Sequence, residues 1–191
     1  TTVEEVCLLI HETFSEQPTE DILTLFQVLG GLPNLTKLLF NTYRFPFVAT
    51  LPILAFTNLF KGAQNLVEFK LWRADLALLF PNDASSSCAF DELAEALVRS
   101  TALKEFRLIK CRLTEETRKV CTLDPLIQGL AKLPNLREIE LSATKMSALG
   151  GLSTRSISQL FRSSSLVALS LRNFDLSEEA VLEIANSLLQ H

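Results

Sequence analysis

The sequence has no apolar run long enough to cross a membrane, and it has almost no histidine. Its longest apolar stretches, Val6 to Ile10 and Leu51 to Phe56, fall well short of the roughly 18 residues that a membrane-spanning helix requires. Only two histidines are present, His11 and His191, so a Ser/His/Asp or Cys/His catalytic arrangement has poor prospects. We expect no membrane-spanning segment and no catalytic activity.

Motifs for phosphate or nucleic-acid binding are also missing. The pairs Gly30-Gly31 and Gly150-Gly151 lie outside any G-x-x-x-x-G-K-[ST] or G-x-G-x-x-G pattern, and those patterns are what build a phosphate cradle. A net charge of -4 argues against broad nucleic-acid binding, which depends on clustered Lys and Arg. We expect no bound cofactor and no nucleic-acid partner.

The four cysteines do not form the C-x2-C pairs that a structural zinc site favours. They are scattered over the chain as Cys7, Cys88, Cys111 and Cys121. Cys7 and Cys111 occupy positions where we expect buried, reduced thiols. No metal site is predicted. Since no disulfide framework is discernible, the sequence favours an intracellular location, in the cytoplasm or nucleus.

The length and composition indicate one globular domain. The chain has 191 residues, of which 48% are apolar and 21% are charged, and such values are typical of a folded domain of ordinary size. We expect a single domain over residues 1–191.

A strand-length pattern, L-x-x-L-x-L, recurs with substitutions six times along the chain. Self-similarity at this scale indicates a repeat architecture. The six copies are Val3, Val6, Leu8; Leu35, Leu38, Phe40; Leu66, Phe69, Leu71; Leu103, Phe106, Leu108; Leu136, Ile139, Leu141; and Leu166, Leu169, Leu171.

A second pattern lies between the strand motifs, with apolar residues at i, i+3, i+4 and i+7, which is one face of a helix. Three copies are regular: Ile22, Leu25, Phe26, Leu29; Phe90, Leu93, Ala94, Leu97; and Leu123, Leu126, Ile127, Leu130. Two are weaker: Ile53, Phe56, Thr57, Phe60; and Ser153, Ser156, Ile157, Leu160. Strands joined through helices are parallel, so the sequence predicts an α/β fold with one parallel sheet and helices outside it.

The segment from Leu103 to Leu113, LKEFRLIKCRL, resembles the strand half of a leucine-rich repeat, L-x-x-L-x-L-x-x-[N/C]-x-L. The segment from Ser177 to Leu189 is similar to the helical half of a ribonuclease-inhibitor-like repeat. The resemblance implies a right-handed solenoid, or horseshoe, of about six repeats, with the sheet on the concave face and the helices on the convex face. Only Cys111 keeps the usual residue at the Asn/Cys position, which marks a divergent member.

Two further features concern the ends and the longest connector. The helical stripe returns near the C-terminus, and its register places a next strand leucine at position 194, beyond His191. Neither end carries a polar capping repeat, so we expect a segment of a longer protein that can self-associate through its apolar ends.

The polar connector 81–88 is either an insertion near a binding face or an insertion without function.

Side chains between the motif leucines should point away from the core, because they alternate along a strand. In the third and fourth repeats, Arg107 aligns beside Lys70 and Ile109 beside Trp72, with Asp75 as a single acid in the same patch. The predicted partner-binding residues are Lys70, Trp72, Arg73, Arg107, Ile109, Lys110 and Arg112. Trp and Arg are enriched in interface hot spots, so we predict a protein partner, and the basic excess favours an acidic segment.

The sequence is also compatible with other functions and with another role for Trp72. Trp72 could merely cover neighbouring aliphatic stems on an ordinary polar strand face. The chain could also be a regulator of another enzyme, as leucine-rich-repeat activators of small GTPases and inhibitors of nucleases are, although no residue matches a motif that would carry those activities over. Catalysis by the paired Glu138 and Glu140 is disfavoured, because a solvated surface explains them. The preferred hypothesis is a non-catalytic interaction module or scaffold.

Overall fold

The computed structural model describes residues 2–9, 19–42, 49–78, 89–144, 149, 152–163, 165–174 and 176–189. Both histidines, Cys88 and the connector 81–88 lie outside these residues. The described strands are β1 (Glu5–Leu9), β2 (Lys37–Asn41), β3 (Ala49–Pro52), β4 (Glu68–Trp72), β5 (Ala74–Ala77), β6 (Glu105–Leu113), β7 (Glu138–Ala143) and β8 (Ala168–Arg172). The described helices are α1 (Thr19–Gly30), α2 (Ile53–Gly62), α3 (Ala89–Val98), α4 (Glu115–Val120), α5 (Asp124–Ala131), α6 (Thr154–Phe161) and α7 (Glu178–Leu189).

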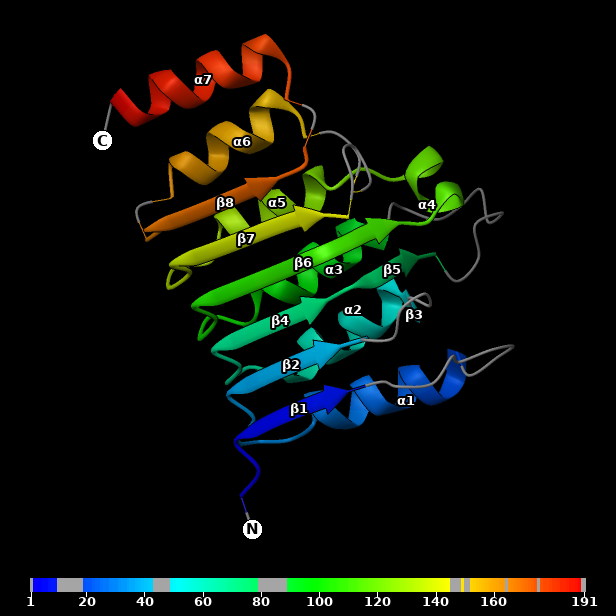
Figure 1. The fold of residues 1–191 in the computed structure, drawn as a ribbon. Coiled ribbons are helices and arrows are strands. Elements are labelled where there is room, and N and C mark those ends of the chain that lie inside the picture. Colours follow the sequence, from blue (N-terminus) through cyan, green and yellow to red (C-terminus); the bar gives the residue numbers. More distant parts are fainter. Residues whose placement is uncertain are drawn as a thin grey trace.

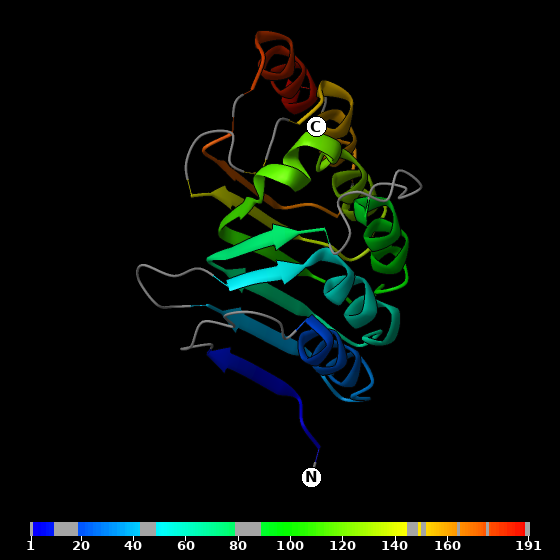
Figure 2. The same ribbon diagram turned by 90° about the vertical axis from the view of Figure 1, so that its right-hand side faces the viewer.

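The main sheet contains one strand from each predicted motif, so the predicted α/β fold with a parallel sheet is confirmed. Its strands lie in sequence order, β1-β2-β4-β6-β7-β8, and every neighbouring pair is parallel. Figure 1 shows this order as a progression of colour across the sheet. Figure 2 shows the long helices on one side of the sheet, and none of the described helices covers the other face.

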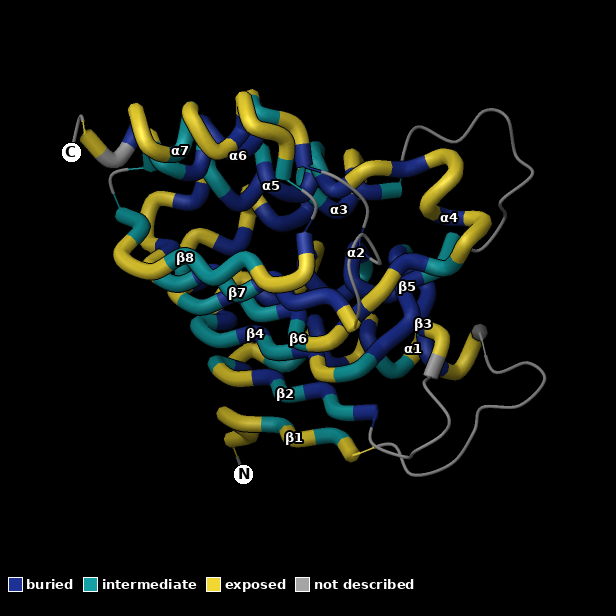
Figure 3. The backbone as a smooth tube through the Cα atoms, turned by 45° about the horizontal axis from the view of Figure 1, so that its top comes forward, coloured by how far each residue is buried: buried dark blue, intermediate teal, exposed yellow. Residues whose placement is uncertain are grey.

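The core lies between the sheet and the helices, where Figure 3 colours the backbone as buried. Strand pairing brings equivalent motif positions into register, so they form buried rows across the sheet. One row contains Leu38, Phe69, Phe106 and Ile139, and the next contains Phe40, Leu71, Leu108 and Leu141. We call a strand of the main sheet and the helix that follows it a unit. Because every unit contributes the same motif positions, the core is continuous from one unit to the next.

The helices follow the predicted apolar stripes, including the two weaker ones. All four stripe residues of α2 are buried. In α6, Ser153 caps the first turn by accepting a hydrogen bond from the backbone N–H of Ser156, which satisfies one of the unpaired donors of a helix start. Pro125 lies in the first turn of α5, where its missing N–H costs no hydrogen bond. Successive helices α1, α2, α3, α5, α6 and α7 pack side by side.

Phenylalanine rings connect neighbouring units inside the core. Phe69 lies at the centre of this group, with its ring centroid 5.8 Å from that of Phe56, 5.1 Å from that of Phe60 and 5.4 Å from that of Phe106. Edge-to-face and offset ring pairs at such separations add stability beyond the area they bury. The same rings therefore join α2, β4 and β6.

The sequence did not predict β3, β5 or α4. β3 and β5 form a second parallel array with the far half of β6, in the order β3-β5-β6. The branch begins where Arg73 and Lys110 adopt left-handed φ angles of 59° and 54°. The β6–β7 register also shifts between Ile109 and Cys111. An extra residue with left-handed backbone bends a strand. The chain beyond Arg73 therefore continues as β5 in the second array, and the part of β6 beyond Lys110 pairs with β5.

The two predictions for buried thiols have different outcomes. Cys111 is buried, and its burial raises the pKa of the thiol to about 12, so the side chain stays protonated and unreactive near neutral pH. Cys7 is exposed, and the prediction for it was wrong. It lies between Val6 and Leu8, whose side chains turn inward, and alternation therefore turns Cys7 outward.

Candidate protein-binding surface

The face of the main sheet opposite the described helices carries three rows of side chains across the strands. We call it the sheet surface. The first row is Glu5, Lys37, Glu68, Glu105, Glu138 and Ala168; the second is Cys7, Leu39, Lys70, Arg107, Glu140 and Ser170; the third is Leu9, Asn41, Trp72, Ile109, Ser142 and Arg172. The predicted alignments of Lys70 with Arg107 and of Trp72 with Ile109 are confirmed.

Ion pairs connect the first two rows from β2 to β7. The Lys70 amine lies 3.1 Å from the Glu68 carboxylate and 3.3 Å from that of Glu105. The Arg107 guanidinium lies 3.1 Å from the carboxylate of Glu105 and 2.7 Å from that of Glu138. Lys37 extends the network to β2, 3.1 Å from Glu68. Lys70 and Arg107 are thus neutralised by acidic neighbours within the sheet surface.

The carboxyl of Glu68 is held by two lysines, and its ionisation should affect stability. Burial alone would raise the pKa of Glu68, but hydrogen bonds from Lys37 and Lys70 outweigh it and lower the pKa below 4.5. A group with a lowered pKa stabilises the fold above its ordinary pKa, and this contribution is lost as the pH falls through the lowered value. The pH range in which the stabilisation by Glu68 is lost therefore lies below 4.5.

We expect the free energy of unfolding of the wild type to fall more steeply below pH 4.5 than that of Glu68→Gln, which has no carboxyl to protonate at this position. Urea unfolding at a series of pH values down to about 3 measures the difference. The matched control is Glu116→Gln on α4, an exposed glutamate that forms no ion pair with a described residue, and its curve should parallel the wild type. Parallel curves for Glu68→Gln and wild type would contradict the assignment.

A separate ion pair, between Arg112 and Asp75, lies where the second array joins β6. The Arg112 guanidinium donates two hydrogen bonds to Asp75, with nitrogen–oxygen distances of 2.6 and 2.5 Å. Hydrogen bonding to Asp75 raises the pKa of Arg112. Asp75 is 6% exposed, so the prediction that it shares an exposed patch was wrong. The chain turns at Arg73 and carries Asp75 into the second array, beneath the more exposed Arg112.

The predicted binding residues come together on β4 and β6 and just beyond them. Trp72 and Ile109 are neighbours in the third row, and Trp72 is 39% exposed. The backbone N–H of Arg73 donates to the carbonyl oxygen of Ile109 at 2.8 Å, which holds the two strand ends together. Lys110 is exposed. Lys70 and Arg107 lie in the row below.

The sheet surface is polarised along the strands. Its first row, near the amino ends of the strands, carries four glutamates and one lysine. Its third row is apolar at Trp72 and Ile109, and the basic residues Lys110 and Arg112 follow it on β6. A partner that contacts the third row would meet apolar area and positive charge together.

Sequence reasoning missed part of the third row. Leu9, 55% exposed, and Arg172 lie in the same row as Trp72. Both follow the last apolar position of their own strand motif by one residue, as Trp72 does, so the motif register carried the signal.

Among the described residues, no group of three or more His, Cys, Asp and Glu side chains could hold a metal ion. No described helix is both long and apolar enough to span a membrane. The sequence matches no protein-family model and no curated protein.

Proposed function

We propose that the chain is a non-catalytic protein-interaction module of the leucine-rich-repeat type, divergent from the ribonuclease-inhibitor-like class and intracellular. Support comes from the six strand motifs that align in one parallel sheet, from the helices packed side by side on one face, and from Cys111 buried at the Asn/Cys position. In this proposal the sheet surface is the concave face of a right-handed solenoid.

The proposed binding site is the third row of the sheet surface around Trp72 and Ile109. The observation that carries the proposal is an exposed tryptophan beside Ile109, next to the ion-pair network of the first two rows. Nothing in the core requires an indole there, and tryptophan is among the residues that contribute most energy at interfaces. An apolar side chain of a partner would cover Trp72 and Ile109.

An acidic residue in the same partner segment would complete the contact. Lys70 and Arg107 are already paired with glutamates, so they contribute little attraction for an added carboxylate. Lys110 is exposed, and Arg112 keeps 47% of its side chain exposed although it binds Asp75. We therefore place the acidic residue of the partner beside Lys110 and Arg112, one step beyond Trp72.

Affinity capture with variants of the chain tests this proposal. Trp72→Ala combined with Lys110→Glu should lower the amount of bound partner at least tenfold, because one hot-spot residue alone contributes about 2 kcal/mol or more. The control Val28→Ala removes an apolar side chain of α1 that is 58% exposed, and it should capture as much partner as the wild type. Identical partner sets for all three proteins would contradict the proposal.

A further inference from the structure

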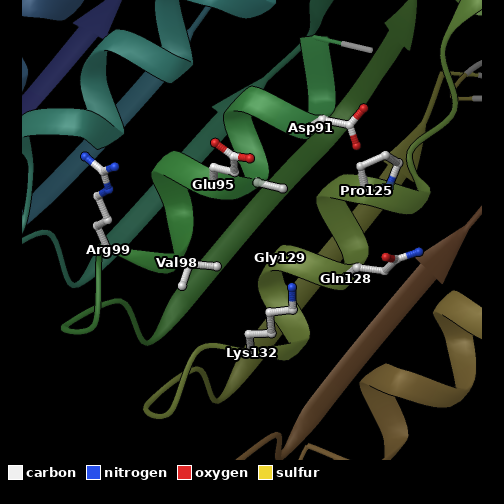
Figure 4. A pocket seen from close by; sticks show the side chains of 9 residues that line it. Asp91, Glu95, Val98, Arg99, Pro125, Gln128, Gly129 and Lys132 are labelled. Carbon is white, nitrogen blue, oxygen red and sulfur yellow. The ribbon is translucent and has the colours of Figure 1, made fainter. Parts of the chain in front are cut away.

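A groove of about 530 Å³ lies between α3 and α5 on the helix face, away from the sheet surface. Figure 4 shows the two helices side by side, with side chains from both along the groove. The residues used in the argument are Asp91, Glu95 and Val98 from α3, and Pro125, Gly129 and Lys132 from α5 and its end. A volume of this size is within the range of ligand-binding clefts in proteins.

Gly129 allows α3 and α5 to approach each other closely at the bottom of the groove. A Cβ atom at this position would lie 2.9 Å from both the Cα and the Cβ of Ala94, so only glycine permits the observed approach of the two helices. Glycine within a helix costs about 1 kcal/mol relative to alanine. Since neither Gly129 nor Ala94 has a long side chain, the space above their contact stays open.

The groove is charged at both ends, and its charges are unpaired. Asp91 and Glu95 project from α3, and Lys132 extends back along α5 from its end. None of these three side chains makes an ion pair or a hydrogen bond with another described residue. Arg99 borders the groove as well, but Figure 4 shows its guanidinium turned away from α5. The groove is therefore acidic toward the helix starts and basic toward the helix ends.

Helix dipoles alone do not account for this arrangement. A negative charge in the first turn and a positive charge at the end stabilise a helix, which explains Asp91 and Lys132. Glu95 lies in the middle of α3, where this interaction has faded. Val98, 37% exposed, adds apolar surface at the basic end. Charge of both signs, apolar area and an open floor together suit a ligand with its own charges of both signs.

We propose that the α3–α5 groove binds an extended peptide segment of a partner protein that carries a basic and an acidic residue three positions apart. From Asp91 to Val98, which stands with Lys132 at the basic end of the groove, an α-helix rises about 10 Å. Residues three positions apart in an extended chain are also separated by about 10 Å. The basic residue pairs with Asp91 and Glu95, the acidic residue pairs with Lys132 beside Val98, and the residues between them cover Gly129. This second site is independent of the sheet surface.

Three synthetic hexapeptides test the proposal, identical except for the second and fifth positions, which carry arginine and aspartate, two arginines, or two aspartates. Titration of the isotope-labelled chain, followed by NMR chemical shifts, gives the location and the affinity of binding. We expect shifts confined to α3 and α5 and an affinity for the mixed-charge peptide at least fivefold above that for either like-charged peptide. Binding should weaken as salt is added.

Charge variants distinguish this groove from a non-specific charged surface. Lys132→Glu should make the two-arginine peptide the tightest ligand, and Glu95→Lys should weaken the mixed-charge peptide at least threefold. Glu92→Lys is the matched control, since Glu92 is an exposed residue of α3 that does not border the groove, and it should leave the order of affinities unchanged. Equal affinity for the three peptides, shifts located on the sheet surface, or no binding by the mixed-charge peptide would overturn the proposal.

Discussion

Replacing Phe69 with alanine is expected to lower the free energy of unfolding by about 4 kcal/mol. Phe69 is 1% exposed and its ring contacts those of Phe56, Phe60 and Phe106. The substitution removes buried apolar area and leaves a cavity whose walls come from α2, β4 and β6. Because these walls belong to different units, they cannot all move inward without disturbing the strand register.

Urea unfolding monitored by circular dichroism measures the loss. Phe69→Leu keeps much of the volume and should cost less than about 1.5 kcal/mol, so it remains measurable if the alanine variant fails to fold. Val28→Ala removes an exposed side chain and should change stability by less than about 0.5 kcal/mol. A loss below about 1 kcal/mol for Phe69→Ala would contradict the packing described for the phenylalanine group.

Gly30→Ala is expected to destabilise the chain by about 2 kcal/mol, although alanine is the better helix former. A Cβ atom on Gly30 would lie 2.6 Å from the carbonyl oxygen of Leu59, and one on Gly62 would lie 2.7 Å from the carbonyl oxygen of Gly30. Both contacts are with backbone, which cannot rotate aside as a side chain can. The ends of α1 and α2 would have to separate.

The neighbouring glycine provides a matched control for this prediction. A Cβ atom on Gly31 would lie 3.4 Å from the carbonyl oxygen of Val28, which is an acceptable contact. Gly31→Ala should therefore be neutral or slightly stabilising, since alanine restricts the unfolded chain more than glycine does. Thermal unfolding of the two variants measures the contrast, and equal melting temperatures for both would show that the α1–α2 approach is looser than described.

The main sheet and its helices were predictable because their signals are periodic. Leu71 and Leu108 could be assigned to neighbouring strands from motif position alone, and Phe56 and Phe60 to one helix face from their spacing. The second array was not predictable. It depends on left-handed backbone at Arg73 and Lys110, and arginine and lysine give no sign of that conformation, which glycine or asparagine would have indicated.

The position of the candidate site was predictable from the sequence, but the neutralisation of Lys70 and Arg107 by neighbouring glutamates was not. Alternation along a strand placed Trp72 and Ile109 on the sheet surface. The same alternation puts Glu68 and Glu105 beside Lys70 and Arg107, but alternation alone does not show which of these side chains form ion pairs. Asp75 was misplaced for a different reason, because the strand bends at Arg73 and alternation no longer holds beyond the bend.

Site-specific photo-crosslinking tests the central claim most directly, namely that a protein partner binds the sheet surface at Trp72. A photoreactive phenylalanine derivative replaces Trp72 in one protein and Val28 in another, and both are irradiated in cell extract. Trp72 lies on the sheet surface and Val28 on the helix layer, and both are exposed. A discrete crosslinked protein from position 72 and none from position 28 is the predicted result. Crosslinks of equal yield from both positions, or from position 28 alone, would contradict it.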